Sequence, residues 1–292
     1  MSGEGKTIVL RRLLALGFLL GWVPCVGQEV PYFVTYSHHL EEPGALEVEV
    51  KSAMGGPRGG HGFAGSSVEL EYGTTGWLTS ELYLDFVETR GENTVPGGFR
   101  VENRIRPLLR EHWINPVLYF EFENINGANK SLLEVVGHDG AADLLGTASE
   151  TRKEKKREVE LKLILSSDAK GWNFSENLIF EKNLTNSPWE FGYALGASRP
   201  LRLSASAGRC TFCAQNLTGG VEMYGGLGDR YTPGLHDTSQ YAGPVAGWQM
   251  PHGPRLMFEA GFGLNDYSLP HVYRAGVAYD LGQRFRRRGD RR

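Results

Sequence analysis

A pair of cysteines, Cys210 and Cys213 in Cys-Thr-Phe-Cys, stands out among the residues of this 292-residue chain that are suited to chemistry. Two cysteines at this spacing can form a redox pair, half of a metal site or a local disulfide. Covalent haem attachment requires a histidine next, and Ala214 stands there instead. No further pair with zinc-ligand spacing lies nearby in the sequence. We therefore predict a disulfide, formed in an oxidising compartment, that holds the long connection 198–218 together.

Histidines beside carboxylates form the second chemical feature. His38 and His39 lie close to Glu41 and Glu42, a set of side chains that can chelate a metal ion. The ordinary interpretation of such a pattern is a polar segment with incidental histidines, and we favour it here. The sequence therefore predicts no metal and no cofactor.

Two more histidines are each followed by an aspartate, in His138-Asp139 and His236-Asp237. Both pairs fall in predicted external loops, where an acid–base pair can serve a surface hydrolase. The sequence contains no nucleophile-elbow Gly-x-Ser-x-Gly, no complete phosphate-binding loop, no dinucleotide fingerprint and no His-Glu-x-x-His. We predict that the chain is not an enzyme, with a surface-exposed barrel hydrolase as the alternative.

Alternating hydrophobicity is the main signal for the elements that must position these residues. Near the C-terminus, two runs of about ten residues alternate between apolar and polar or small side chains. A period of two places alternate side chains on opposite faces of a β-strand, and about ten residues suffice for a tilted strand to cross a bilayer. The apolar positions are Leu256, Phe258, Ala260, Phe262 and Leu264 in the first run, and Tyr273, Ala275, Val277, Tyr279 and Leu281 in the second.

Runs of this kind recur about twelve times between residues 44 and 285. Trp77, Trp113, Trp172 and Trp189 lie at predicted strand ends, as the aromatic girdles of membrane barrels do. A soluble β-sandwich or secreted barrel also alternates, but it has no need of aromatic residues there. We predict an all-β fold: a single antiparallel up-and-down transmembrane β-barrel of about 12 strands, after a cleaved signal peptide.

An even strand number places both ends of such a barrel in the periplasm. Counting back from the C-terminus then assigns a side to each connection. The predicted external loops are 51–62, 89–98, 125–156, 183–187, 229–240 and 265–270, and the predicted periplasmic turns are 73–76, 110–115, 166–171 and 251–254. The connection 198–218 is the exception, because it is long and yet falls on the periplasmic side.

The beginning of the chain has the features of a secretory signal peptide. Lys6, Arg11 and Arg12 precede the apolar run Leu13–Val23, and small residues precede a cleavage site after Gly27. Removal of three basic residues and one acidic residue changes the net charge from −3 to −5, and such a chain has no basic surplus for nucleic acid. We expect a signal peptide at 1–27, a periplasmic N-terminal lead-in at 28–43, the barrel at 44–285 and a basic C-terminal tail at 286–292.

The signal peptide, the alternating runs and the terminal strand Val272–Leu281 resemble those of uncharacterised, porin-like outer-membrane β-barrel proteins of Gram-negative bacteria. The resemblance covers nearly all of the mature chain and is architectural. It implies a place in the outer membrane, contact with the lipid bilayer and lipopolysaccharide, and recognition by the barrel-assembly machinery. That machinery recognises an aromatic residue at the end of the last strand, and Phe285 lies on the same face of the strand as Tyr273 and Tyr279. The basic tail beyond Phe285 departs from the pattern. The resemblance implies no substrate and no catalytic residue.

The polar faces of the predicted strands would line the barrel lumen. Charges in a confined channel select ions by sign, and acidic residues outnumber basic ones on these faces. We predict a narrow channel for passive transport of small, cation-leaning solutes. The alternative is a closed structural barrel whose charged side chains pair and plug the lumen. The predicted lining residues are Glu69, Glu71, Glu81, Asp85, Arg100, Arg104, Arg106, Glu121, Glu123, Glu158, Glu160, Lys162, Glu259 and Arg274.

Overall fold

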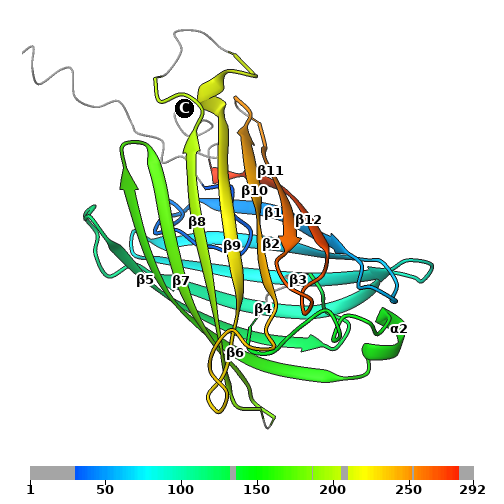
Figure 1. Cartoon of the computed structure of the whole chain (residues 1–292). Helices are drawn as coiled ribbons and strands as arrows, with labels where there is room; N and C mark the ends of the chain where they lie inside the picture. The colour runs from blue at the N-terminus through cyan, green and yellow to red at the C-terminus, as the bar shows by residue number, and fades with distance from the viewer. Residues whose placement is uncertain (1–29, 132–135, 186, 205–209, 252, 283–292) are drawn as a thin grey trace, which may run out of the picture.

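Twelve antiparallel strands form one closed sheet, which confirms the predicted fold. The computed structural model describes residues 30–131, 136–185, 187–204, 210–251 and 253–282. The strands follow one another in chain order, and β1 pairs with β12 to close the barrel (Figure 1). They are β1 (Leu46–Gly55), β2 (Phe63–Thr75), β3 (Leu78–Thr89), β4 (Val95–Ile105), β5 (Asn115–Asn126), β6 (Lys155–Ala169), β7 (Trp172–Asn183), β8 (Trp189–Pro200), β9 (Leu217–Asp229), β10 (Gln240–Gln249), β11 (Arg255–Gly263) and β12 (His271–Asp280).

Two short helical turns lie in connections between the described strands, α2 (Ala148–Thr151) and η1 (Ala214–Asn216). No helix in the part of the chain that the structure describes is long and apolar enough to span a membrane. The predicted signal peptide, Phe285 and the basic tail lie outside the described residues.

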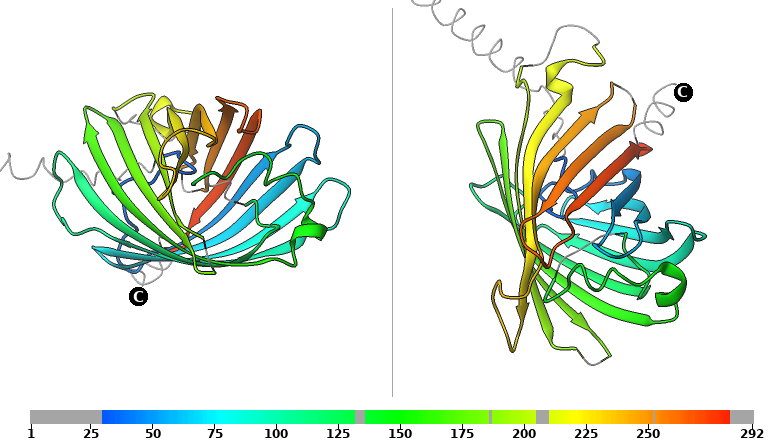
Figure 2. Two further views of the ribbon diagram at one scale, coloured as in Figure 1. Left: turned by 60° about the horizontal axis from the view of Figure 1, so that its bottom comes forward. Right: turned by 45° about the vertical axis from the view of Figure 1, so that its right-hand side comes forward.

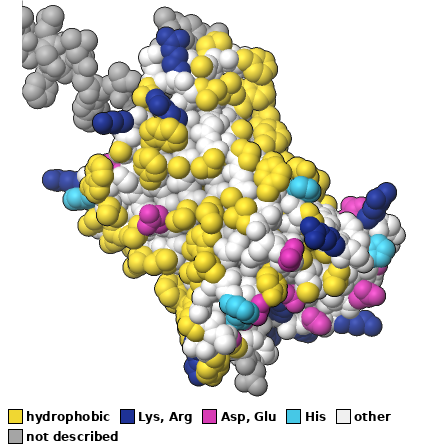
Figure 3. Space-filling model, in the orientation of Figure 1, with side chains coloured by type: hydrophobic (Ala, Val, Ile, Leu, Met, Phe, Trp, Pro, Cys, Tyr) yellow, Lys and Arg dark blue, Asp and Glu magenta, His cyan; other side chains and the backbone are white. Residues whose placement is uncertain are grey.

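The wall of the barrel is apolar outside and polar inside. In β3, Leu82 and Leu84 are exposed, whereas Glu81 and Asp85 on the alternate positions are buried. Figure 3 shows apolar side chains across the outer face, with most charged side chains towards its ends. A soluble β-protein buries its apolar face and hydrates its polar one. This wall does the reverse, which excludes the soluble sandwich and fits a barrel surrounded by hydrocarbon.

Several strands are longer than the alternation indicated, and β1 and β4 are two of them. β1 continues to Gly55 and β4 begins at Val95, where the sequence predicted loops at 51–62 and 89–98. The Ser52 and Ser66 hydroxyls hydrogen-bond at 2.8 Å across β1 and β2 in the extra stretch. These strand ends consist largely of small residues, whose hydrophobic contrast is too weak to show a period of two.

The N-terminal segment, defined here as residues 30–43, runs inside the barrel and has no helix or strand of its own. The ring of strands surrounds this segment (blue) and the connection between β5 and β6 (green) in Figure 2. The sequence predicted that residues 28–43 precede the barrel as a lead-in. The described part of that stretch instead contacts the inner wall, because wall side chains supply partners for its backbone. Its side of the membrane stays a prediction.

Glycines in the wall make room for both internal segments. A side chain on Gly196 in β8 would collide with the ring of Tyr32, at 2.6 Å from a built Cβ. A side chain on Gly226 in β9 would collide with the carbonyl oxygen of Gly137. These close approaches explain why the inner face has glycine at these two positions.

The long connection between β8 and β9 carries the cysteine pair. Cys210 and Cys213 form a disulfide, directly before the turn η1. The ring of Phe212 stacks on Trp248 with centroids 4.5 Å apart, and the Trp248 indole N–H donates to the Thr211 carbonyl at 2.9 Å. The bridged loop is therefore fixed against β10.

Replacing Leu84 with Arg should destabilise the folded barrel by about 2–4 kcal/mol, because Leu84 points outward near the middle of β3 and the new charge would enter hydrocarbon. The control is Glu88→Arg, at an exposed position near the end of the same strand, with an expected change below about 1 kcal/mol. Urea titration of protein refolded in lipid vesicles measures both values. Equal stability of the two variants would contradict the assignment of the outer face.

Candidate functional site: the charged barrel interior

A single carboxylate on the inner wall holds the middle of the N-terminal segment. The backbone N–H groups of Phe33, Val34 and Thr35 donate to the Glu222 carboxylate at 3.1, 2.8 and 2.5 Å. Glu222 lies on β9 and is buried. Because the segment belongs to no sheet, its backbone donors need such acceptors, and hydrogen bonds to a charged group are the strong ones.

A second wall residue holds the next peptide of the segment. Asn177 on β7 accepts from the Tyr36 N–H at 2.6 Å and donates to the Tyr36 carbonyl at 2.9 Å. The Tyr36 ring packs edge-on against Tyr119 at 5.1 Å, and its hydroxyl donates to Glu102 at 3.2 Å. The segment is thus bound by matched polar contacts and an inward-facing aromatic pair.

Arg100 is the centre of the buried ion-pair network. Its guanidinium donates to Asp85 at 3.0 Å and to Glu121 at 2.8 Å, and it lies 4.0 Å over the Tyr83 ring. The residue is 0% exposed. Asp85 also accepts from Asn129 of the β5–β6 connection at 2.9 Å. This network ties three wall strands to one of the internal segments.

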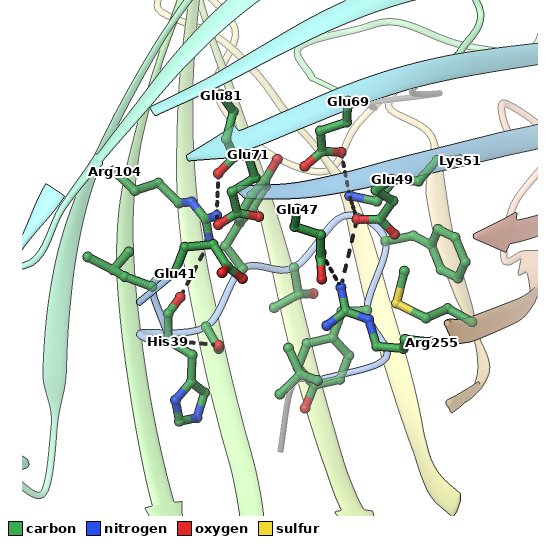
Figure 4. A pocket seen from close by; sticks show the side chains of 18 residues that line it. His39, Glu41, Glu47, Glu49, Lys51, Glu69, Glu71, Glu81, Arg104 and Arg255 are labelled. Carbon is green, nitrogen blue, oxygen red and sulfur yellow. Dashed lines mark hydrogen bonds and ion pairs between the residues drawn. The ribbon is translucent and has the colours of Figure 1, made fainter. Parts of the chain in front are cut away.

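Arg104 lies four residues after Arg100 on the same face of β4, and it bridges a second group of carboxylates. It contacts Glu71 and Glu81 directly and Glu102 at 3.2 Å, and it donates to the His39 carbonyl at 3.5 Å. Arg104, Glu71, Glu81 and His39 line a carboxylate-rich cavity of about 100 Å³ beside the N-terminal segment (Figure 4). The arginine links the segment to the wall and offsets part of the negative charge.

The carboxylate-rich cavity keeps a surplus of acidic side chains. Lys51 pairs with Glu49 at 3.2 Å and with Glu69 at 3.0 Å, and Arg255 pairs with Glu47 at 2.9 Å (Figure 4). Six carboxylates line the space against three basic groups. The carboxylates are Glu41, Glu47, Glu49, Glu69, Glu71 and Glu81, and the basic groups are Lys51, Arg104 and Arg255.

A larger cavity of about 390 Å³ lies at the other end, under the β5–β6 connection. Lys130 of that connection donates to the carbonyls of Leu144 and Gly146 at 3.1 and 2.7 Å, so the connection is closed on itself. Burial raises the pKa of Asp139 to about 6, against the opposing charge of Lys156. The cavity is therefore a charged vestibule bounded by a folded loop.

The predicted lining residues fall into five places. Glu69, Glu71, Glu81 and Arg104 line the carboxylate-rich cavity, and Asp85, Arg100 and Glu121 form the central network. Glu123 and Glu158 line the vestibule, and the pairs Glu160–Lys162 (2.9 Å) and Glu259–Arg274 (2.5 Å) are buried on the inner wall. Arg106 follows the end of β4 and binds Glu111 in the turn at 3.0 Å, so it lies outside the strands.

Sequence reasoning missed several inner residues. Arg255 opens the final hairpin and points inward, and the alternation that placed Leu256 outside would have found it. Asn177 and Glu222 were on the correct face, but their partners are backbone groups of a segment that no strand pattern reveals. The signal for those contacts exists only in three dimensions.

The N-terminal histidines meet one carboxylate from the end of β6 and one from the turn between β4 and β5. His38 Nε2 lies 2.8 Å from Glu111 and 3.8 Å from Asp168, and His39 Nε2 lies 3.1 Å from Asp168. Glu41 and Glu42, the neighbours in sequence, are not part of this cluster. Burial and the adjacent His39 lower the pKa of His38 to about 4, so its ring is neutral at neutral pH.

The rim histidines are brought near each other by two loops. His138 Nε2 lies 2.8 Å from the Thr232 hydroxyl, and its Nδ1 lies 3.4 Å from the Asp237 carbonyl. His236 pairs with Asp237 at 2.7 Å and is 92% exposed. His138 therefore contacts a hydroxyl and a carbonyl of the neighbouring loop.

Comparison with known proteins supports the fold. No protein-family model and no characterised protein matches this sequence. An outer membrane channel from Pseudomonas putida F1 superposes with a TM-score of 0.52 at 13% identity, over 87% of this chain and 100% of that one. The translocator domain of the autotransporter NalP from Neisseria meningitidis gives 0.41 at 14% identity over 94% and 95% of the two chains. LpxR from Salmonella typhimurium gives 0.41 at 12% identity over 80% and 99%. The chain has the fold of an outer-membrane β-barrel protein.

Replacing Arg100 with Met should cost about 3–5 kcal/mol of stability, because Asp85 and Glu121 would be left buried without their cation. Adding Asp85→Asn and Glu121→Gln to Arg100→Met should recover most of this loss. The matched control is Arg58→Met, since Arg58 is 81% exposed at 3.9 Å from Asp266 and its removal should cost below about 1 kcal/mol. Urea titration in lipid vesicles compares the variants. Equal losses of stability in Arg100→Met and Arg58→Met would contradict the prediction, because the central network would then contribute no more than the surface pair.

Proposed function

We propose that this protein is a plugged outer-membrane channel for small, cation-leaning solutes, with the N-terminal segment as its plug. The observation that carries the proposal is the attachment of that segment. It lies in the interior with a bend at Phe33 and Val34 and no strand of its own, and three consecutive N–H groups share the one carboxylate of Glu222. A segment held in this way can leave the lumen without disturbing the hydrogen bonds of the wall.

Charge supports the preference for cations. The carboxylate-rich cavity lies directly beside the plug and carries six acidic against three basic groups. When the segment leaves, this surplus faces the opened path, and charges in a confined polar channel select ions by sign. The buried pairs around Arg100 occupy part of the interior, which favours small solutes.

The position in the cell follows from the same proposal. An outer face of leucine and phenylalanine with charged ends fits the lipid bilayer and lipopolysaccharide of a Gram-negative outer membrane. Insertion there would use the barrel-assembly machinery. The similarity to a channel of Pseudomonas putida F1 supports the fold on which this proposal rests.

Replacing Glu222 with Ala should open the channel. The change removes the shared acceptor of three buried N–H groups, each of which costs about 1–3 kcal/mol when it is left without a partner. Single-channel recording in planar bilayers should show rare openings for the unaltered mature protein and at least about tenfold more frequent openings for the variant. In a salt gradient across the bilayer, the sign of the reversal potential should show that cations pass more readily than anions.

Glu88→Ala is the matched control, because Glu88 is an exposed carboxylate near the end of β3 and does not touch the plug. It should behave like the unaltered protein. Heat-modifiable migration on gels verifies that each variant is folded before recording. A Glu222→Ala barrel that is folded and stays silent would identify a closed structural barrel, and anion preference would overturn the choice of solute.

We further infer that the protein is not a hydrolase at its rim. His236 is 92% exposed, and the Thr232 hydroxyl that faces His138 also lies 3.2 Å from the Asp229 carboxylate, so it is shared between two polar partners. The double variant His138→Ala, His236→Ala should keep the conductance of the parent protein. Hydrolysis of ester or lipid substrates by the parent that is lost in this variant would establish the enzyme alternative.

A further inference from the structure

We propose that His38, His39, Asp168 and Glu111 form a binding site for a divalent transition-metal ion of the zinc type. The histidines come from the N-terminal segment, Asp168 from the end of β6 and Glu111 from the turn between β4 and β5. Three chain segments that are far apart in sequence thus place two imidazoles and two carboxylates together. Imidazole and carboxylate are ligands that zinc accepts.

The ligand atoms of His38, His39 and Asp168 lie within 4.8 Å of one another, and Glu111 adjoins this group through His38. Tetrahedral zinc with bonds of about 2.0–2.1 Å holds its ligand atoms about 3.3 Å apart. The Nε2 atoms of His38 and His39 lie 3.8 and 3.1 Å from the same oxygen of Asp168. Nε2 of His38 lies 2.8 Å from Glu111. These separations lie on both sides of the ideal value, so small side-chain movements are enough to coordinate an ion.

The surroundings orient the ligands. Nδ1 of His38 is 2.8 Å from the Ser166 hydroxyl, which leaves Nε2 facing the carboxylates. The other oxygen of Asp168 accepts from Asn173 at 2.8 Å, and that of Glu111 accepts from Arg106 at 3.0 Å. Partners that fix the second atom of each ligand are a regular feature of metal sites.

Burial and charge also suit an ion better than a simple ion pair. His38 is 0% exposed, while Glu111 and Asp168 are 55% and 40% exposed, so the site has a closed back and an open front. Asp168 and Glu111 supply two negative charges beside the imidazoles, and Arg106, which pairs with Glu111, offsets one of them. An ion entering from the open side would have three or four protein ligands and room for water.

The consequence is a clamp between the plug and the wall. The metal would join the N-terminal segment to the end of β6 and to the turn between β4 and β5. These contacts would add to the hydrogen bonds of the segment with Glu222 and Asn177. Binding of the ion does not require that the barrel conducts. Metal affinity can therefore fail or succeed independently of the proposed channel.

The test is calorimetric titration of Zn²⁺ into the folded, untagged mature protein in detergent. We expect one equivalent of Zn²⁺ to bind, and His39→Ala and Asp168→Asn each to weaken binding at least about tenfold. The absorption spectrum of the Co²⁺-loaded protein should report nitrogen and oxygen ligands and should change in both variants. Heat-modifiable migration on gels verifies that each variant is folded. If His39→Ala folds poorly, Asp168→Asn still tests the site, because asparagine has nearly the same size and shape as aspartate.

His236→Ala is the matched control, because it removes a histidine that pairs with a carboxylate away from the cluster. It should bind Zn²⁺ like the unaltered protein. Absence of stoichiometric binding by the unaltered protein would overturn the proposal. The proposal would also be overturned if folded His39→Ala and Asp168→Asn bound Zn²⁺ with unchanged affinity, or if the affinity of the control His236→Ala fell by the same factor.

Discussion

The constraint on which this structure depends is the pairing of every backbone N–H and C=O inside hydrocarbon. No water is available there, so a sheet crosses a bilayer only when its two edges meet. The contact that closes this sheet is the pairing of β1 with β12, from Glu47 opposite Asp280 to Gly55 opposite Val272. Once the ring is closed, the alternation of each strand sends apolar side chains to lipid and polar ones inward.

The inward polar face then creates its own requirement. Charged side chains confined within the wall need partners, because an isolated buried charge is very costly. Arg100 and Arg104 on one strand meet this need for carboxylates on both neighbouring strands. The pairs are consequently part of the stability of the barrel as well as of its electrostatic character.

The N-terminal segment meets a related requirement in a different way. Its backbone has no neighbouring strand, and Glu222 and Asn177 supply hydrogen-bond partners from the wall. Gly196 provides the space for the ring of Tyr32. The interior is thus shaped to receive this particular segment. The carboxylate-rich cavity lies beside this segment, and the histidine cluster makes further contacts between the segment and the wall.

The sequence by itself determined the strands, their number and their faces, because a period of two is a local property that survives in any barrel. It also placed Cys210 and Cys213 close enough to bridge. Only the tertiary structure decided that residues 30–43 turn back into the lumen and that His38 meets Asp168 and Glu111 instead of Glu41. Segments without periodicity take their position from contacts with distant residues, and ring closure is what brings those residues together.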